Sequence, residues 1–575
     1  MQILREHLFK YPTYILGAVI SAVASIGTML YQPKLLQDIL NAILKNNMDA
    51  IKTLSVWLIF LAVIGVISGI YNVYFAAKIA QNVTSDLRLR TYQKIQSFSF
   101  GNIEHFSSGS LVVRLINDMN QITNLLMSVF MQFLRMPLMF IGAFIMGVYT
   151  LPRLWWLEIL MIILVILVSI FTFQKMGRLF GQVQIFMDKI NTRAKETLQG
   201  MRVVKSFNQE ANNSANFNQT SDELNKINLW IGYIFSASFP AFMLATYAAI
   251  ALAIYLVGGS ITSHPSDVAA ISSYVTYLSL VMNAIIVIGM TATMVSRGLV
   301  SLERIKEVLD TKPDLTYVTD QDEDLKGSVE FKHVSFTYPD SKQETLHDIS
   351  FKVAPGQKIG IVGKTGSGKS TLAQLIARLY DPSSGEIDLG GKNIKEVSQK
   401  TVTKTVSFVL QRAILFSGTI NENLRQGKKT ASQAEIEKAA QIAQAEEFIS
   451  KYPDTFEHEV EERSANFSGG QKQRLSLARG VVGNPVVLIL DDSTSALDAK
   501  SEKLVQEGLA KHLKGTTTFI IAEKLVSVKD ADQILVLDDG HLSACGTHAE
   551  LLKTSPVYQE IYQTQKAKER RSDLS

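Results

Sequence analysis

One stretch of the sequence carries the residue types that hold nucleotide phosphates. It reads Gly-Lys-Thr-Gly-Ser-Gly-Lys-Ser, follows the apolar run 358–362 and precedes a helical pattern over 371–379. In this order of strand, loop and helix, glycines let backbone N–H groups face phosphate oxygens, and the helix N-terminus adds a favourable electrostatic potential. Lys369 is placed to neutralise the phosphates, and the Ser370 hydroxyl is placed to ligate Mg²⁺. The expected phosphate-binding residues are Gly363, Lys364, Thr365, Gly366, Ser367, Gly368, Lys369, Ser370 and Thr371.

A carboxylate further along the chain adds to this chemistry. The run Val486–Asp491 has the composition of a buried parallel strand and ends in Asp491, a position from which an acid can hold the water shell of Mg²⁺. Taken alone, an apolar run that ends in aspartate is only the end of a strand, and the glycine segment alone could be a turn without a ligand. Together they favour a nucleotide hydrolase or switch domain of the α/β class.

The first half of the chain has a different composition from the domain around this site. Hydrophobic residues make up 47% and charged residues 19% of the 575 residues, and the apolar ones concentrate before about residue 300. A helix needs ~20 apolar residues to cross a bilayer core of ~30 Å. Without the alternating pattern of a barrel strand, only helices satisfy the backbone in lipid. The six expected spans lie near residues 13–31, 53–76, 126–148, 154–173, 230–258 and 268–295.

Basic residues in the connections predict the orientation of these spans. Lys and Arg gather between the second and third spans and between the fourth and fifth, whereas the connection 149–153 is short and 259–267 contains neither residue type. Because cytoplasmic connections are the basic ones, both termini and the nucleotide-binding domain are expected in the cytoplasm of a multi-pass protein of the cell membrane. A cleaved secretory signal is the competing interpretation of the first span, but no small-residue cleavage site follows it.

The two basic connections lack the composition of flexible loops. The patterns over Val83–Ile95 and Ile185–Leu198 are helical, so the spans are expected to continue into the cytoplasm and to reverse at Phe100–Phe106 and Gln199–Phe207. These reversals are candidates for contact with a soluble domain. The predicted organisation is a transmembrane domain over 1–310, a linker over 311–326, a nucleotide-binding domain over 327–565 and a basic tail over 566–575.

Charge and cysteine content exclude other classes of function. The formal net charge is +4, and the basic residues form no stripe of the kind that binds nucleic acid. Cys545 is the single cysteine, which excludes an intramolecular disulfide and a cysteine-built metal site. We therefore expect no nucleic-acid partner.

A further motif identifies the family that this sequence resembles. The segment Phe467-Ser-Gly-Gly-Gln-Lys-Gln-Arg, upstream of Asp491, resembles the signature sequence of ABC transporters. Six spans followed by one nucleotide-binding domain resemble a half-transporter of the multidrug-exporter type. The specific motifs lie within 327–560, and the membrane half matches mainly by layout, with Gln199–Phe207 as its most similar stretch. The resemblance implies a helical membrane domain joined to an α/β P-loop NTPase domain, with ATP and Mg²⁺ as ligands.

The resemblance also implies a dimer and assigns further residues. In that family each ATP lies between the phosphate loop of one nucleotide-binding domain and the signature of the other. Carried over by motif, Tyr338 would stack on adenine, and Gln411 would contact Mg²⁺ or water and sense the membrane domain. The signature residues that would contact ATP held by the partner are Ser468, Gly469, Gly470 and Gln471. The segment that would cross between the two domains is Ser495, Ala496, Leu497 and Asp498.

Two positions of the site depart from the family pattern. Asp492 stands where the pattern has the glutamate that polarises the attacking water, and Glu523 stands where it has a histidine beside the γ-phosphate. An aspartate is one methylene shorter, and general-base assistance is typically worth ~10²–10⁴ in rate. Glu523 replaces a hydrogen-bond donor with a negative charge. We expect slow hydrolysis at this phosphate loop, although the signature is intact.

This combination resembles the degenerate subunit of heterodimeric bacterial exporters. The hypothesis is that this chain holds ATP at its own loop, rarely cleaves it, and supplies its signature to an active site on a second half-transporter. The alternative is a slow homodimer in which both changes are tolerated drift. Another alternative is an ATP-gated channel or regulatory subunit, but the chain has no long regulatory insertion and no arginine series. An exporter with its own protease would need an N-terminal catalytic domain, which the first span at about residue 13 excludes.

The membrane half contains candidates for a cargo site. Arg135 in the third span and Glu158 in the fourth are ionisable residues in predicted spans, for which a place in a polar cavity is the usual expectation. Positions near the ends of their spans are the alternative explanation. Ordinary packing between helices is expected for most of the aromatic and methionine side chains, some of which could instead line an apolar cavity. These side chains are Phe235, Phe239, Phe242, Met243, Tyr274, Tyr277, Met282 and Met290. The predicted cargo is an amphipathic drug, lipid or peptide.

Overall fold

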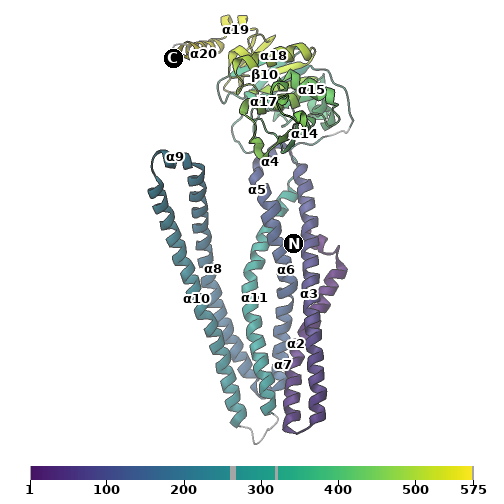
Figure 1. The fold of residues 1–575 in the computed structure, drawn as a ribbon, viewed down its shortest axis with the longest axis vertical. Helices are drawn as coiled ribbons and strands as arrows, with labels where there is room; N and C mark the ends of the chain where they lie inside the picture. Colours follow the sequence, from purple (N-terminus) through teal and green to yellow (C-terminus); the bar gives the residue numbers. More distant parts are fainter. Residues whose placement is uncertain (1, 260–266, 318–320, 573–575) are drawn as a thin grey trace. The chain divides into compact units, whose positions relative to one another are not determined.

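The chain folds into two compact units. The computed structural model describes residues 2–259, 267–317 and 321–572. Unit 1 comprises Met1–Gln96 and Gly109–Thr311, and unit 2 comprises Ser97–Ser108 and Lys312–Ser575 (Figure 1). The sequence-based boundary at residue 310 assigns the segment 97–108 to the membrane domain, whereas in the structure this segment packs with the nucleotide-binding unit.

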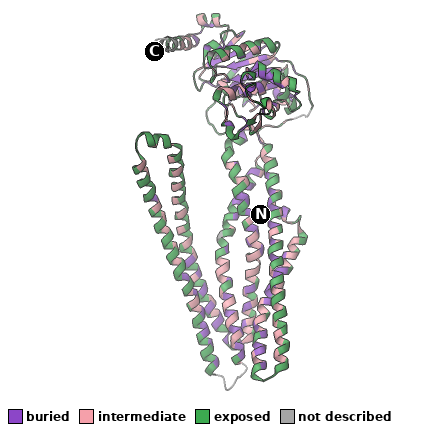
Figure 2. Ribbon diagram, in the orientation of Figure 1, coloured by how far each residue is buried: buried purple, intermediate pink, exposed green. Residues whose placement is uncertain are grey.

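Unit 1 consists of long helices. In the described part of the chain, six helical segments are long and apolar enough to cross a membrane, as the sequence predicts. They are Pro12–Leu44 (α2), Met48–Gln96 (α3), Ser108–Thr150 (α5 to α7), Pro152–Gln199 (η3 and α8), Glu210–Gly259 (α10) and Asp267–Asp310 (α11). The short helix α1 (Gln2–Leu8) precedes them. Along α3 many large apolar side chains are exposed, among them Val56, Ile59, Val63 and Val66, which is the surface expected of a helix that faces lipid (Figure 2).

The third of these segments is not a regular helix. It comprises α5 (Ser108–Val113), η1 (Arg114–Asp118), α6 (Met119–Ser128), η2 (Val129–Phe133) and α7 (Arg135–Thr150). The elements η1 and η2 are π-helical turns, in which one residue is inserted and the side chains beyond it are rotated.

The long helices reverse at the two positions predicted from sequence. Helix α4 (Phe100–Phe106) follows α3, and helix α9 (Met201–Ser206) joins α8 (Trp155–Gln199) to α10. Within unit 2, the Tyr380 hydroxyl donates a hydrogen bond to Glu104 Oε2 at 2.5 Å, and Phe100 packs edge-on against the Tyr380 ring. These contacts explain why α4 belongs to unit 2.

Unit 2 is built on two main sheets. An antiparallel sheet has the order β2-β1-β4-β5, and a mostly parallel sheet has the order β12-β11-β3-β10-β9-β6. The strands of the first are β1 (Val329–Phe336), β2 (Leu346–Val353), β4 (Ser384–Leu389) and β5 (Lys392–Asn393). Those of the second are β3 (Lys358–Gly363), β6 (Val406–Val409), β9 (Val487–Asp491), β10 (Thr517–Ile521), β11 (Gln533–Asp538) and β12 (His541–Gly546). A small pair, β7 (Gly418–Thr419) and β8 (Glu459–Val460), lies apart.

The parallel strands position the chemistry of unit 2. Strands β3, β10 and β9 are neighbours in the sheet, and β9 is buried along its whole length. Their carboxyl ends therefore meet at one edge, where the loops after all three strands lie together. Besides α4, the described α-helices of this unit are α12 (Lys369–Ile376), α13 (Gln399–Thr405), α14 (Ile420–Arg425), α15 (Gln433–Ile442), α16 (Glu446–Ile449), α17 (Gly469–Val481), α18 (Ala499–His512), α19 (His548–Thr554) and α20 (Pro556–Ser572).

Candidate functional site

The phosphate loop joins β3 to α12, as its sequence predicts. Gly366 and Gly368 have φ angles of +84° and +92°, in the left-handed region where a side chain would be strained. A Cβ at Gly363 would lie 2.2 Å from the carbonyl oxygen of Leu537. The loop can therefore take this path only with glycine at these positions, and the path leaves room for phosphate oxygens at the start of α12.

Side chains of the loop present polar atoms suited to ATP and Mg²⁺. Lys369 Nζ donates hydrogen bonds to the carbonyl oxygens of Gly363 at 2.9 Å and Lys364 at 2.8 Å. The Ser367 hydroxyl is buried and has no hydrogen-bond partner among the residues that the structure describes. The Ser370 hydroxyl donates to Asp491 Oδ1 at 3.2 Å, which brings together the hydroxyl and carboxylate oxygens that Mg²⁺ prefers. These donors and acceptors fit a nucleoside triphosphate with its metal ion.

Electrostatics at this edge of the sheet are set by burial and by several acids. Burial lowers the pKa of the Lys369 ammonium, while the surrounding carboxylates, Glu523 first among them, act in the opposite direction. Burial raises the pKa of Asp491, and the hydrogen bond from Ser370 partly offsets this rise. Asp492, which follows β9, and Glu523, in the loop after β10, are thus both close enough to Lys369 to influence its pKa.

Both departures from the family pattern lie at this edge. Asp492 follows β9 with a φ of +44°, and its backbone N–H donates to the carbonyl oxygen of Ile521 at 3.0 Å. Gln411 Nε2 donates to Asp492 Oδ2 at 3.3 Å, so the structure brings together two residues that are distant in sequence. Glu523 is exposed in the loop after β10.

Tyr338 lies beside the phosphate-loop helix. Its hydroxyl is hydrogen-bonded to Thr371 Oγ1 at 2.9 Å and to Gln374 Oε1 at 3.0 Å. Its ring packs edge-on against Phe336 and Tyr380. The half-buried ring is therefore held in a defined position beside α12, and its stacking on adenine stays a prediction.

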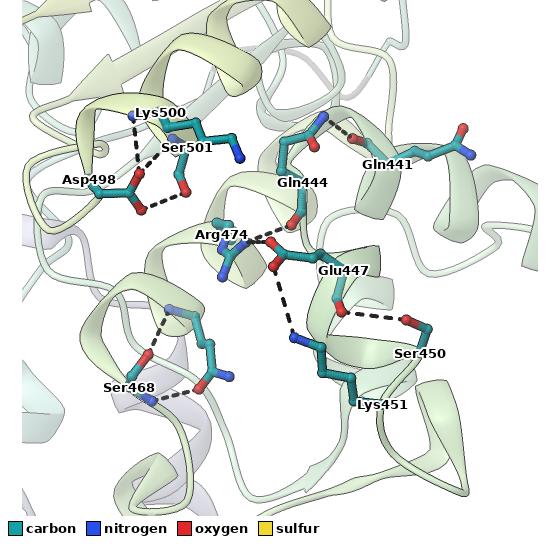
Figure 3. A network of polar contacts seen from close by, with 11 residues as sticks. Gln441, Gln444, Glu447, Ser450, Lys451, Ser468, Arg474, Asp498, Lys500 and Ser501 are labelled. Atoms are coloured by element: carbon teal, nitrogen blue, oxygen red, sulfur yellow. Dashed lines mark hydrogen bonds and ion pairs between the residues drawn. The ribbon is translucent and has the colours of Figure 1, made fainter.

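The signature residues begin α17. The Ser468 hydroxyl accepts a hydrogen bond from the backbone N–H of Gln471 at 3.4 Å, and Gln471 Oε1 accepts one from the backbone N–H of Ser468 at 2.8 Å (Figure 3). This reciprocal pair is a capping box. Further along α17, Arg474 Nη1 donates to Glu447 Oε2 at 3.0 Å and to the carbonyl oxygen of Gln444 at 2.9 Å.

The predicted crossing segment packs directly on the signature helix. Gln473 Oε1 accepts from the backbone N–H of Ala496 at 2.9 Å, and Gln473 Nε2 donates to Ser495 Oγ at 3.2 Å. Asp498 caps α18 through the backbone N–H groups of Lys500 at 3.1 Å and Ser501 at 2.9 Å (Figure 3). Within one chain, segment 495–498 thus connects the end of β9 to the signature.

One part of the site was not recognised from sequence. Helix α20 crosses the predicted domain boundary at residue 566 and contacts the site. Gln565 Oε1 accepts from the backbone N–H of Leu525 at 2.8 Å, and Gln565 Nε2 donates to the carbonyl oxygen of Glu523 at 2.6 Å. Glu560 pairs with Lys364 of the phosphate loop at 3.1 Å. Sequence offers no signal for these contacts, because glutamine and glutamate are ordinary residues on an exposed helix.

Gln565→Ala is expected to loosen the loop that carries Glu523. Two hydrogen bonds are lost, each worth about 1 kcal/mol, so amide exchange over 522–527 should rise by roughly fivefold or more. Hydrogen exchange followed by mass spectrometry measures this. Gln559→Ala is the matched control on the same helix, because its side chain bonds only to the carbonyl oxygen of Leu552 at 2.7 Å among the described residues. Equal effects of the two variants would contradict a specific role for Gln565.

Unit 1 contains a large cavity of about 1260 Å³. It lies between α8 and α10 on one side and α11 and the third segment on the other. Four of the eight aromatic and methionine candidates line it, namely Phe235, Phe239, Phe242 and Met290. The other four, Met243, Tyr274, Tyr277 and Met282, are not among the lining residues. Tyr274 and Tyr277 belong to a buried apolar cluster and Met282 packs against it, as the alternative of ordinary helix packing predicts.

The polar lining of this cavity differs from the prediction. Neither Arg135 nor Glu158 lines it; Arg135 Nη2 contacts Met29 Sδ at 2.8 Å, and Glu158 is fully buried elsewhere. Arg297 and Arg304 of α11 line the cavity instead, together with the buried Asp118, whose Oδ1 accepts from Ser301 Oγ at 2.8 Å. The cavity therefore combines aromatic and methionine side chains with charged groups.

Comparisons with known proteins agree with this architecture. The model of the ABC transporter transmembrane region matches residues 15–285, and the ABC transporter model matches residues 346–495. The chain belongs to the ABC transporter family, as an exporter half-transporter with an N-terminal transmembrane domain and a C-terminal ABC ATPase domain. Membership implies ATP binding, with Mg²⁺ as the customary metal, and action as a dimer in the membrane.

Individual relatives cover nearly the whole chain. An uncharacterized ABC transporter ATP-binding protein, YfiB of Bacillus subtilis strain 168, is 35% identical over 96% of this chain and 96% of its own length. An ATP-dependent lipid A-core flippase of Pseudomonas putida is 35% identical over 85% of this chain and 81% of its own length. Among solved structures, a bacterial Atm1-family ABC exporter with ATP bound matches with a TM-score of 0.79 and 25% identity, over 96% of this chain and 98% of that one.

Proposed function

We propose that this chain is one half of a heterodimeric exporter of amphipathic compounds, of the multidrug type. In this proposal it holds ATP at its own phosphate loop, cleaves it slowly, and completes a fully active site on its partner. The observation that carries the proposal is the combination on one chain of an intact loop, an intact signature helix and two altered catalytic positions, Asp492 and Glu523.

The geometry after β9 supports slow hydrolysis at this chain's loop. Asp492 emerges from the strand with its backbone tied to Ile521 and its carboxylate bonded to Gln411. A carboxylate held back by one methylene is too far from a water aligned for attack, and small misplacements of a general base are costly. Glu523 adds negative charge beside the loop, where a developing phosphate charge needs a donor.

The proposed role of this chain in the partner's site rests on α17. Ser468 offers a hydroxyl and the N-terminus of a 13-residue helix, which together suit the γ-phosphate of ATP on another chain. Segment 495–498 links this helix to Asp492 and gives a physical route between the two sites. Because both ATP sites need residues from two chains, each half depends on the other.

The cavity in unit 1 supports amphipathic cargo. Phenylalanine and methionine side chains adapt to apolar ligands of varied shape. Arg297 and Arg304 can bind a polar or anionic head group of the cargo. The name of the flippase relative points to lipid as one cargo class. A slow homodimeric exporter of lipid or peptide is the second candidate, favoured by that relative. An ATP-gated channel is a third candidate and has no feature in its favour.

The orientation is part of the same proposal. The basic connections support a cytoplasmic location for α4, α9, both termini and the ATPase domain, in a multi-pass protein of the cell membrane. The connection 149–153 then faces outward, and most of the second predicted outward connection, 259–267, lies outside the described residues. ATP-driven closure of the two ATPase domains would be transmitted through α4 and α9 to switch the cavity from inward to outward access.

ATP hydrolysis by the purified chain tests this proposal. We expect little turnover from the chain alone in lipid discs, and clear turnover when it is co-purified with the product of an adjacent half-transporter gene. Binding of a fluorescent ATP analogue by the lone chain shows that low turnover is not caused by unfolding. Brisk hydrolysis by the chain alone would reject the heterodimer and make Asp492 a competent base in a homodimer.

A further inference from the structure

The carboxyl group of Glu158 is buried without a partner. Glu158 lies in the first turn of α8 and has no exposed surface. Both of its carboxyl oxygens lack a hydrogen-bond partner in the described part of the chain. A carboxylate removed from water in this way costs several kcal/mol unless a cation or donors compensate it. Burial without such compensation favours the neutral form of the group, which carries a proton.

The surroundings of Glu158 are built to accept a neutral acid. A Cβ at Gly147 of α7 would lie 2.7 Å from Glu158 Oε2 and 2.8 Å from Oε1, so the missing side chain makes room for the carboxyl group. Tyr274 of α11 is close enough to interact electrostatically with Glu158, but its hydroxyl already donates to the carbonyl oxygen of Leu154 at 2.9 Å. Leu154, Leu157, Met161 and Ala143 belong to the same buried apolar cluster.

Other titratable groups on the packed elements leave this carboxyl uncompensated. The connecting turn η3 (Pro152–Leu154) carries Arg153, whose side chain is exposed. Helix α10 carries Tyr247 and Tyr255 near this end, both largely exposed, and α11 begins with Asp267. Tyr277 of α11 donates to the carbonyl oxygen of Leu30 at 2.8 Å, and Arg135 is at the opposite end of α7. Among the described residues Glu158 therefore has no ion-pair partner.

We propose that Glu158 is a proton-binding site of the membrane unit. It holds a proton while the end of α7, the start of α8 and the start of α11 are packed together, as they are here (Figure 1). When these ends separate and water enters, the carboxyl O–H bond breaks, the proton passes to water and a hydrated carboxylate remains. Closure of the helices returns a proton from water to the carboxylate. The charge balances without any other reactant.

The position of the site determines where the proton is exchanged. In the proposed orientation the connection 149–153 faces outward, so the proton is exchanged with the external solution. If these helix ends separate in an outward-opening cycle, one proton per copy is exchanged in each cycle. This cyclic part rests on the proposed function, whereas proton binding in the packed state does not.

Infrared spectroscopy of the full complex in lipid discs tests proton binding. At neutral pH we expect a carbonyl-stretch band of a protonated carboxylic acid that shifts in D₂O and is missing in Glu158→Gln, which keeps the size of the side chain without the acid. Glu158→Asp should retain an acid band at a changed frequency. If Glu158→Gln fails to assemble, a pH titration of the wild-type band and the Asp variant still decide the question. Identical spectra for wild type and Glu158→Gln would overturn the proposal.

Proton release tests the cyclic part separately. The complex is trapped with ATP and vanadate in weakly buffered solution containing a pH indicator, and wild type should release up to one proton per copy more than Glu158→Gln. Replacing Na⁺ by choline should leave both readouts unchanged, and a band that depends on Na⁺ would make this a metal-cation site instead. Equal proton release with a normal acid band would refute exchange during the cycle. Failure of ATP hydrolysis in the complex would count against the proposed function alone, since the resting spectrum needs no turnover.

Discussion

Replacing Asp492 by glutamate and Glu523 by histidine in the same chain should raise ATP hydrolysis at its phosphate loop by ~10²-fold, because general-base assistance is typically worth ~10²–10⁴. The longer side chain at 492 moves the carboxylate toward the water, starting from a backbone fixed by the Ile521 carbonyl. Histidine at 523 supplies a donor where Glu523 now adds negative charge.

This rise in ATP hydrolysis must be measured without a contribution from the partner's own ATP site. The pair is assembled in lipid discs with the partner's own general base replaced by its amide, so that the remaining turnover comes from this chain's loop. Asp530→Glu combined with Glu437→His is the matched control, since both residues are exposed in the same domain. A rise below threefold, or an equal rise in the control, would show that these two positions do not limit hydrolysis.

Replacing Ser468 by alanine should lower ATP turnover of the pair by ~10²-fold. The change removes a hydroxyl expected to contact ATP on the partner, and loss of one such donor typically costs ~10²–10³ in rate. It also removes the N-cap of α17, which destabilises a helix by about 1 kcal/mol. The kcat of the pair and thermal unfolding of the complex measure the two effects separately.

A second capping box separates catalysis from stability. Ser432 caps α15 as Ser468 caps α17: its hydroxyl accepts from the backbone N–H of Glu435 at 3.3 Å, and Glu435 Oε2 accepts from the backbone N–H of Ser432 at 2.7 Å. Ser432→Ala should cost similar stability and change turnover by less than twofold. If both variants lose turnover equally, Ser468 acts only through the helix.

Local sequence patterns were sufficient to predict the phosphate loop and the long helices. The phosphate loop depends on glycines whose φ angles are positive in the structure, and the six long helices depend on runs of apolar residues that only a bilayer accommodates. Both signals are contained within about twenty consecutive residues. The same holds for the two reversals of the long helices, which the structure places at α4 and α9.

The lining of the cavity depends on contacts between residues that are distant in sequence, and the sequence did not predict it fully. Membrane helices are apolar on all sides because lipid and core have similar polarity, so sequence could not separate Phe239, which lines the cavity, from Tyr274, which is buried away from it. The two π-helical turns rotate the third segment further. Arg297 and Arg304 were not recognised because they lie beyond the expected apolar window.

By itself the sequence determined the family, the six spans, the phosphate loop and the altered positions 492 and 523, since each is a short-range pattern whose chemistry needs particular residue types. Tertiary structure alone decided which side chains line the cavity, that α4 packs with unit 2, that Gln565 holds the loop of Glu523, and that Glu158 is buried against Gly147. The physical reason is that burial and partnering are properties of packed neighbours, which a linear pattern does not contain.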